Sequence, residues 1–155
     1  MAHYDFGKDF PIAEKTEAQM ADFLEKHAGM EFVEGCNDNR YDLKMKTAGG
    51  KEITIEVKED FTCKQTGNVG VEYECRGKDS GIRVSKADYY LYKVHRPDGK
   101  IEVLINNTKD LKGMIRRRLF HRKVVGGDEG SNSKNYLFRL GLFQEEFMSL
   151  GLVTE

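Results

Sequence analysis

The sequence predicts a single α/β domain in which helices flank a central mixed β-sheet. A segment with helical period comes first, several segments with strand period follow it, and a second helical segment comes after them. A chain of 155 residues is long enough to bury one sizeable core. We therefore expect one domain, with its core at about 11–123 and a C-terminal extension at 124–155.

The first helix is expected over residues 11–28. Its apolar residues recur at spacings of three and four, as in Met20, Ala21, Phe23, Leu24 and Ala28. Gly29 can end this helix, because glycine readily adopts the left-handed conformation found after helices. Glu17 lies three residues before Met20, so its carboxylate projects from the apolar side of the helix, and Glu14 lies nearby on the edge of that side.

Two short strands joined by a glycine turn follow, at 40–46 and 52–58. The length of the turn decides which residues face each other. A two-residue turn sets Asp42 opposite Val57, on the wrong face of the hairpin. A three-residue turn, with Gly50 left-handed, sets Asp42 directly opposite Glu56, with their Cβ atoms roughly 5 Å apart. We predict the three-residue turn.

The later elements are expected from alternation, turn residues and helical spacing. In chain order they are a strand at 71–76, a helical turn or connection at 85–88, a hairpin of strands at 89–94 and 100–105, a helix at 108–122, a glycine-rich loop at 126–133, an apolar segment at 136–140 and a last helix at 143–150.

Composition places few limits on the partners of the protein. The net charge is −1, which favours neither an acidic nor a basic partner. Three cysteines without metal-ligand spacing indicate reduced thiols, as in a cytosolic protein. No apolar run approaches the roughly 20 residues that span a bilayer, and the N-terminus lacks a signal-peptide core. We expect a soluble, cytoplasmic protein that does not interact with membranes.

The segment Glu56-Val57-Lys58 carries the most specific chemical pattern. Successive side chains of a strand point to opposite faces, so Glu56 and Lys58 share a face and lie roughly 6 to 7 Å apart. Asp42, Glu56 and the Val57 carbonyl offer the hard oxygen ligands that Mg²⁺ prefers, and Lys58 can reach an attacking water or a phosphate oxygen. A solvated strand often carries an acid and a lysine two apart, so the motif alone is weak, and Asp42 at hairpin distance and the helix carboxylate of Glu17 strengthen it.

These residues resemble the pattern of the PD-(D/E)XK nuclease superfamily, whose core is a helix with Glu, a strand with Asp and a strand with (Asp/Glu)-x-Lys. Here the order is Glu17, then Asp42, then Glu56-Val57-Lys58. The resemblance covers about 14–92 and is to small nucleases of phages and mobile elements, with a core like that of Holliday-junction resolvases. It implies a restriction-endonuclease-like core and a Mg²⁺-dependent DNA endonuclease.

The resemblance also implies roles for single residues. Asp42, Glu56 and the Val57 carbonyl hold Mg²⁺, for which Mn²⁺ can substitute, and Lys58 acts at the water. Glu17 holds a second metal or a metal-bound water, with Glu14 as its competitor for the helix position. Tyr41 stands where the name of the motif has Pro.

Three further residues are accessory candidates, each with a plainer alternative. Glu72 can lie near the metal, or it is a solvated strand residue paired with a lysine. Asn68 can bind a DNA phosphate, or it is a turn residue. Asp60 can orient Lys58 from the same strand face, or it is a surface acid.

A basic stretch without any acid lies between Leu111 and Gly127. Its DNA-binding candidates are Lys112, Arg116, Arg117, Arg118, Arg122 and Lys123. Such a patch can neutralise phosphates beside a nuclease site, and its alternative is a solvated helix face.

Three functions are compatible with these patterns. The first is a Mg²⁺-dependent DNA endonuclease, in which cutting two strands would favour a homodimer. The second is a non-catalytic DNA-binding protein that keeps the nuclease-like fold, and the third is an RNA-processing nuclease with the same metal chemistry.

Overall fold

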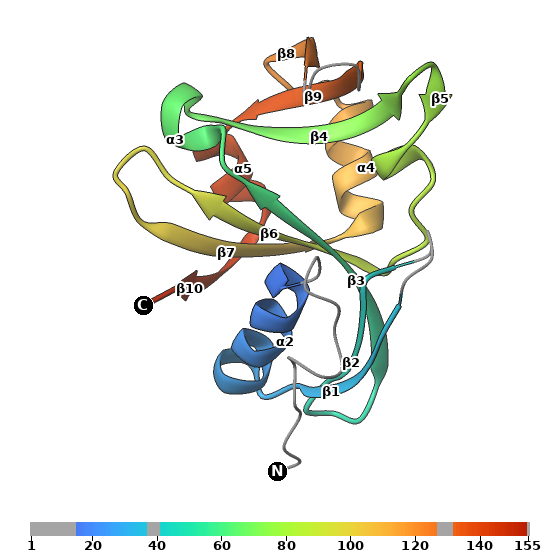
Figure 1. Cartoon of the computed structure of the whole chain (residues 1–155), viewed down its shortest axis with the longest axis vertical. Coiled ribbons are helices and arrows are strands. Elements are labelled where there is room, and N and C mark those ends of the chain that lie inside the picture. The colour runs from blue at the N-terminus through green and yellow to red at the C-terminus, as the bar shows by residue number, and fades with distance from the viewer. Residues whose placement is uncertain (1–14, 37–40, 127–131, 155) are drawn as a thin grey trace.

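A computed structural model describes residues 15–36, 41–126 and 132–154. The protein has an α/β fold built on two β-sheets, one mixed and one antiparallel (Figure 1). In chain order the elements are α2 (Lys15–Ala28), β1 (Glu31–Gly35), β2 (Leu43–Lys46), β3 (Glu52–Asp60), α3 (Cys63–Thr66), β4 (Asn68–Cys75), β5 (Lys78–Asp79), η2 (Gly81–Arg83), β6 (Tyr89–His95), β7 (Ile101–Asn107), α4 (Thr108–Arg116), β8 (Arg122–Gly126), β9 (Ser133–Arg139), α5 (Leu140–Glu146) and β10 (Met148–Leu152).

The larger sheet has six strands in the order β1-β2-β3-β6-β7-β10. Strands β3 and β6 pair in parallel, and the other neighbours pair antiparallel. The smaller sheet is antiparallel throughout, in the order β5-β4-β9-β8. The predicted α/β domain with a mixed sheet is therefore confirmed, whereas the second sheet was not anticipated from the sequence.

The two faces of the six-stranded sheet carry different layers (Figure 1). Helix α2 buries Met20, Phe23 and Leu24 against Ile53, Ile55 and Val57 of β3. The opposite face carries Tyr90 and Tyr92, which pack in a second cluster with α4, α5 and the inner face of the four-stranded sheet. Alternation along β3 therefore turns its apolar residues to α2 and leaves Glu56 and Lys58 on the side of the second sheet.

The β2–β3 hairpin has the register predicted from the glycine turn. The Thr47 amide donates to the Lys51 carbonyl at 2.8 Å, which leaves a three-residue turn at 48–50. Gly50 has φ +89°, a conformation that favours glycine. The ladder ends at Leu43 opposite Ile55. Asp42 lies in a bend just before it and still bonds Ile55 through its amide, so the predicted ladder position opposite Glu56 is not formed, although the two carboxylates lie close enough to interact.

Several element boundaries differ from the sequence predictions. Strand β1 and helix α3 were not expected, and the first helix is described from Lys15. Helix α4 ends at Arg116 instead of near Arg122, because Arg118 adopts φ 56° and the chain then joins β9 as strand β8. Its N-cap is Asn107, whose side chain accepts from the Asp110 amide at 2.7 Å.

The C-terminal segment is an integral part of both sheets. Strand β9 pairs along almost the whole of β4, and β10 adds an edge strand to β7. The expected last helix at 143–150 is instead α5 at 140–146 followed by β10. Residues 132–154 therefore complete the fold, which corrects the expectation of an extension attached to a finished core.

Two expectations from composition concern thiols and membranes. None of Cys36, Cys63 and Cys75 forms a disulfide bond, and Cys63 is buried. Burial raises the pKa of the Cys63 thiol to about 11, which keeps it protonated at neutral pH. Across the described residues, no helix has the length and apolar character needed to cross a bilayer.

Candidate active site

Asp42 and Glu56 meet where the β2–β3 ladder ends. The Asp42 amide donates to the Ile55 carbonyl at 3.0 Å, and its carbonyl accepts from the Cys36 amide at 3.0 Å. Its side-chain Oδ2 accepts from the Val57 amide at 2.8 Å. In a strand, the N–H and C=O of one residue point to the same side, so the Val57 carbonyl also points to the β2 side of β3. The backbone thus holds two carboxylates and one carbonyl together.

Glu56 is a mostly buried carboxylate, with 16% of its side chain exposed. Burial, together with the charge of Asp42, raises the pKa of Glu56 to about 7, and the positive charge of Lys58 opposes this shift. The Lys58 ammonium lies 3.5 Å from Glu56 Oε2. The Ser85 hydroxyl is oriented toward Glu56 Oε1 at 3.4 Å, as a long hydrogen bond. The positive charge of Lys58 therefore does not cancel the effect of burial on the pKa of Glu56.

Tyr90 places an unpaired hydroxyl beside these carboxylates. It stands next to Glu56 in the parallel β3–β6 register, and its side chain is 1% exposed. Among the described residues its buried hydroxyl has no hydrogen bond of good geometry, although the Ser85 hydroxyl is near enough to oppose the rise in its pKa. Burial raises the pKa of Tyr90 well above its ordinary value, and the charges of Glu56, Asp42 and Glu72 add to this shift. Tyr90 is therefore a neutral donor facing an acidic site.

The donor set suits a divalent cation with oxygen ligands. Asp42, Glu56 and the Val57 carbonyl provide hard oxygens, and a cation would relieve the repulsion between the two carboxylates. A water on such a cation would give the Tyr90 hydroxyl an acceptor. Within the described residues, no cluster of three or more His, Cys, Asp or Glu side chains is assembled for metal binding, so only two acids contribute here.

Glu17 does not lie over the face that carries Glu56. Its helix packs on the opposite face of β3, against Ile53, Ile55 and Val57. The preceding residue, Thr16, donates to Glu59 Oε1 at 2.7 Å, on that same opposite face. The expectation that this helix crosses the Glu56 face is therefore wrong, and a metal role for Glu17 stays a prediction. Its competitor Glu14 lies outside the described residues.

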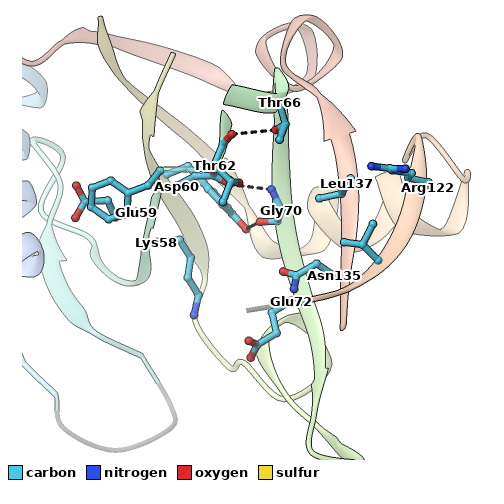
Figure 2. Close-up of a pocket in the computed structure, with 14 residues that line it drawn as sticks. Lys58, Glu59, Asp60, Thr62, Thr66, Gly70, Glu72, Arg122, Asn135 and Leu137 are labelled. Atoms are coloured by element: carbon cyan, nitrogen blue, oxygen red, sulfur yellow. Dashed lines mark hydrogen bonds between the residues drawn. The ribbon is translucent and has the colours of Figure 1, made fainter. Parts of the chain in front are cut away.

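Glu72 lines the same cavity as Lys58. The cavity has a volume of about 530 Å³ and opens between the end of β3 and the four-stranded sheet. Figure 2 shows the Lys58 ammonium and the Glu72 carboxylate at the same end of it. Glu72 Oε2 accepts from the Ser80 hydroxyl at 2.9 Å. Glu72 thus stands close to the candidate site, held by a serine and not by the lysine expected in its plainer alternative.

Asp60 has a structural role that differs from both expectations. It is 8% exposed, and its Oδ1 accepts from the Cys63 amide at 2.9 Å at the start of α3. Its Oδ2 accepts from the Gly70 amide at 2.9 Å in β4 (Figure 2). The carboxylate therefore fastens the α3 turn and β4 to the end of β3, and it is neither a surface acid nor a partner of Lys58 in these bonds.

Asn68 begins β4 and is 8% exposed. It follows the turn residue Gly67, which has φ 72°, and it pairs with Arg139 of β9. Asn68 is therefore a buried strand residue, which corrects the turn interpretation, and a phosphate-binding role stays a prediction.

The basic residues do not form one helix face but lie on α4, on the turn that follows it and on β8. All six are exposed: Lys112, Arg116, Arg117, Arg118, Arg122 and Lys123. Arg117 pairs with Glu146 at 3.7 Å, and Lys123 lies 5.8 Å from the centre of the Tyr136 ring. Arg122 lines the cavity of Lys58, on the other face of β8 from Lys123. Of this group, only Arg122 borders the candidate site.

Ser85 and Tyr90 are the site residues that sequence reasoning missed. Tyr90 belongs to an expected strand, but its place beside Glu56 depends on the parallel pairing of strands that are far apart in the chain. Ser85 lies in the connection before that strand. A pattern in neighbouring residues cannot predict a pairing between distant strands. The glycine turn, which is local, did predict that Asp42 lies near Glu56.

Comparisons of the chain with protein-family models, with curated proteins and with solved structures find no match.

Proposed function

We propose that the protein is a Mg²⁺-dependent endonuclease that hydrolyses phosphodiester bonds of DNA, with a restriction-endonuclease-like core. The observation that carries this proposal is the interacting pair of carboxylates of Asp42 and Glu56, with the Lys58 ammonium 3.5 Å from Glu56. An acid pair with a neighbouring lysine supplies oxygen ligands for a metal and a cation for the charge that builds up on phosphate.

Each residue has a distinct part in this reaction. Asp42 and Glu56, with the Val57 carbonyl, would hold Mg²⁺, and Mn²⁺ could replace it. The metal would polarise the phosphate and bring its own water. Lys58 is 37% exposed at its side chain, so it can contact the phosphate oxygen or the water while it stays paired with Glu56. Tyr90 would donate to an oxygen beside the carboxylates.

The restriction-endonuclease-like interpretation has support from topology as well as residues. A helix precedes an antiparallel hairpin that carries the acids, and the second hairpin strand pairs in parallel with the next strand of the sheet. Glu17 remains a candidate for a further acid, although α2 lies on the other face of β3.

The test is cleavage of supercoiled, branched and single-stranded DNA in Mg²⁺ or Mn²⁺. We expect Asp42→Asn and Lys58→Ala to reduce the rate at least about 100-fold, because each removes a group that acts in the transition state. Glu52→Gln and Lys46→Ala are matched controls, since both are exposed on the same hairpin.

Equal trace cleavage by the wild type and by the Asp42→Asn and Lys58→Ala variants would contradict the proposed endonuclease activity. Salt-sensitive DNA binding without cleavage, unchanged by Asp42→Asn, would identify the non-catalytic alternative. Preferential cleavage of RNA in the same assay would identify the RNA-processing alternative.

A further inference from the structure

The cavity beside Lys58 has a floor made of three neighbouring strands of the smaller sheet. Gly70 of β4 pairs with Leu137 of β9, and Leu137 pairs in turn with Arg122 of β8. The adjacent row on the same face consists of Glu72, Asn135 and Val124, and both rows line the cavity. Lys58 stands at the β4 side of this floor and Arg122 at the β8 side (Figure 2). The floor is thus a strip of sheet with a cation at each end.

The width of the floor suits a chain of phosphates and exceeds the size of one. Asp60 accepts from the Gly70 amide, which holds the end of β3 beside β4, and Lys58 precedes Asp60 by two residues on the same face of β3. Neighbouring strands lie about 4.8 Å apart, so Arg122, two strands beyond Gly70, is roughly 10 Å farther across the floor. One strand of DNA carries a phosphate for every 3.4 Å or so of its axis, and it passes about three nucleotides over that span.

The middle of the floor is open and offers a neutral donor. A Cβ at Gly70 would lie 3.3 Å from Asn135 Oδ1, so this side-chain oxygen is turned to Gly70 and the amide N–H groups lie on its other side. Within the part of the chain that the structure describes, the Asn135 side chain has no hydrogen-bond partner. Asparagine side chains commonly donate to phosphate oxygens in complexes with DNA. Asn135 can therefore bond a phosphate that lies between Lys58 and Arg122.

The charges around the cavity leave Arg122 for an anion. Two of the carboxylates that line it are already hydrogen-bonded on the floor side, since Asp60 accepts from two backbone N–H groups and Glu72 accepts from the Ser80 hydroxyl. The third, Glu59, accepts from Thr16 on the face of β3 that α2 covers. Arg122 is exposed and forms no ion pair with any residue that the structure describes.

We propose that this floor holds the sugar-phosphate backbone of the DNA strand that is cut, as a backbone path from Lys58 at the scissile phosphate, past Asn135, to Arg122 at a phosphate about three nucleotides away. The proposal rests on the proposed nuclease function, because Lys58 joins the path to Glu56. A strand that has to reach Arg122 is cut at an internal position. Short oligonucleotides that lack these phosphates would be poor substrates.

The test measures binding separately from cleavage. Fluorescence anisotropy in Ca²⁺ follows labelled DNA, as single strand and as duplex, over a series of salt concentrations. We expect Arg122→Gln to weaken binding about 5- to 10-fold and to lower the slope of log K against log salt by about one, because one phosphate contact is lost. Lys123→Gln is the matched control. Lys123 is the next residue of β8 and is also exposed, but it lies on the opposite face, over the Tyr136 ring, so its loss should weaken binding less than about twofold.

A second variant tests the middle of the path. Asn135→Asp keeps the size of the side chain and puts a negative charge on the floor, so it should weaken binding about 10-fold, and more at low salt than at high salt. Urea unfolding of each variant shows that the fold is kept.

The outcomes separate the backbone path from the nuclease function. Equal losses in Arg122→Gln and Lys123→Gln would assign DNA binding to the basic surface as a whole, and no loss in Arg122→Gln would remove its contact. Either result overturns the backbone path even if cleavage in Mg²⁺ is intact. Binding that depends on Arg122 and not on Lys123, without cleavage of the same DNA by the wild type in Mg²⁺, overturns the nuclease function and supports the path.

Discussion

At the residue scale, the environment of Glu56 determines how the protein responds to pH. Its pKa is raised to about 7 from an ordinary value of 4.5. Between these values the folded protein keeps a proton that the unfolded chain releases, so the free energy of unfolding falls as pH rises through this window. Above pH 7, the Glu56 carboxylate is charged in the folded state. A bound metal ion, or a neutral side chain in its place, would remove the energetic cost of burying this charge.

We therefore predict that Glu56→Gln alters the pH profile of stability. In metal-free protein, the wild type should lose about 1 to 3 kcal/mol more than the variant between pH 5 and pH 8.5, measured by urea unfolding. Glu52→Gln, at an exposed acid on the same strand, should follow the wild type. Parallel profiles for wild type and Glu56→Gln would show that the carboxyl is not perturbed.

The two acids of the site could be predicted from the sequence, whereas the residues that surround them could not. Asp42 could be brought near Glu56 because the hairpin is local and a glycine determines its turn. Tyr90 could not be placed, because the pairing of β3 with β6 joins strands separated by a long insertion that contains β4. Glu17 was assigned to the wrong face, because helical spacing gives the apolar side of a helix but not the face of the sheet that it covers.

At the element scale, the β2–β3 turn is the feature that brings the acids together. Gly50 has φ +89°, and a Cβ there would meet nothing within 4 Å, so a substitution causes backbone strain without a steric clash. We predict that Gly50→Ala lowers the free energy of unfolding by about 1 kcal/mol. Gly49→Ala should lower the free energy of unfolding by less, because φ at Gly49 is not positive. Equal losses in urea unfolding would contradict this account of the turn.

Helix α4 illustrates where element predictions fail. Arg117, Arg118 and Leu119 have good helix propensity, and no glycine or proline follows Arg116 until Gly126. The helix nevertheless ends there, because Val124 and its neighbours gain more from pairing with β9. The same tertiary pairing turns Arg122 toward the cavity and separates it from the arginines of α4.

At the scale of the whole molecule, the two faces of β3 have different surroundings. Helix α2 closes one face of the larger sheet, and the four-stranded sheet stands over the other with the cavity at its margin (Figure 1). Strands from both sides of β6 in the sequence build this second sheet, so no local pattern reveals it. The α/β class was predictable because it needs only the order of the elements.

The central claim is that Asp42 and Glu56 share one divalent cation. A crystal structure of the protein with Mn²⁺ tests it most directly, through the anomalous signal of the metal. We predict one peak between the two carboxylates and next to the Val57 carbonyl, with the Tyr90 hydroxyl bonded to a metal-bound water, and no such peak in Glu56→Gln. No peak in the wild type, or an equal peak in both proteins, would contradict the claim.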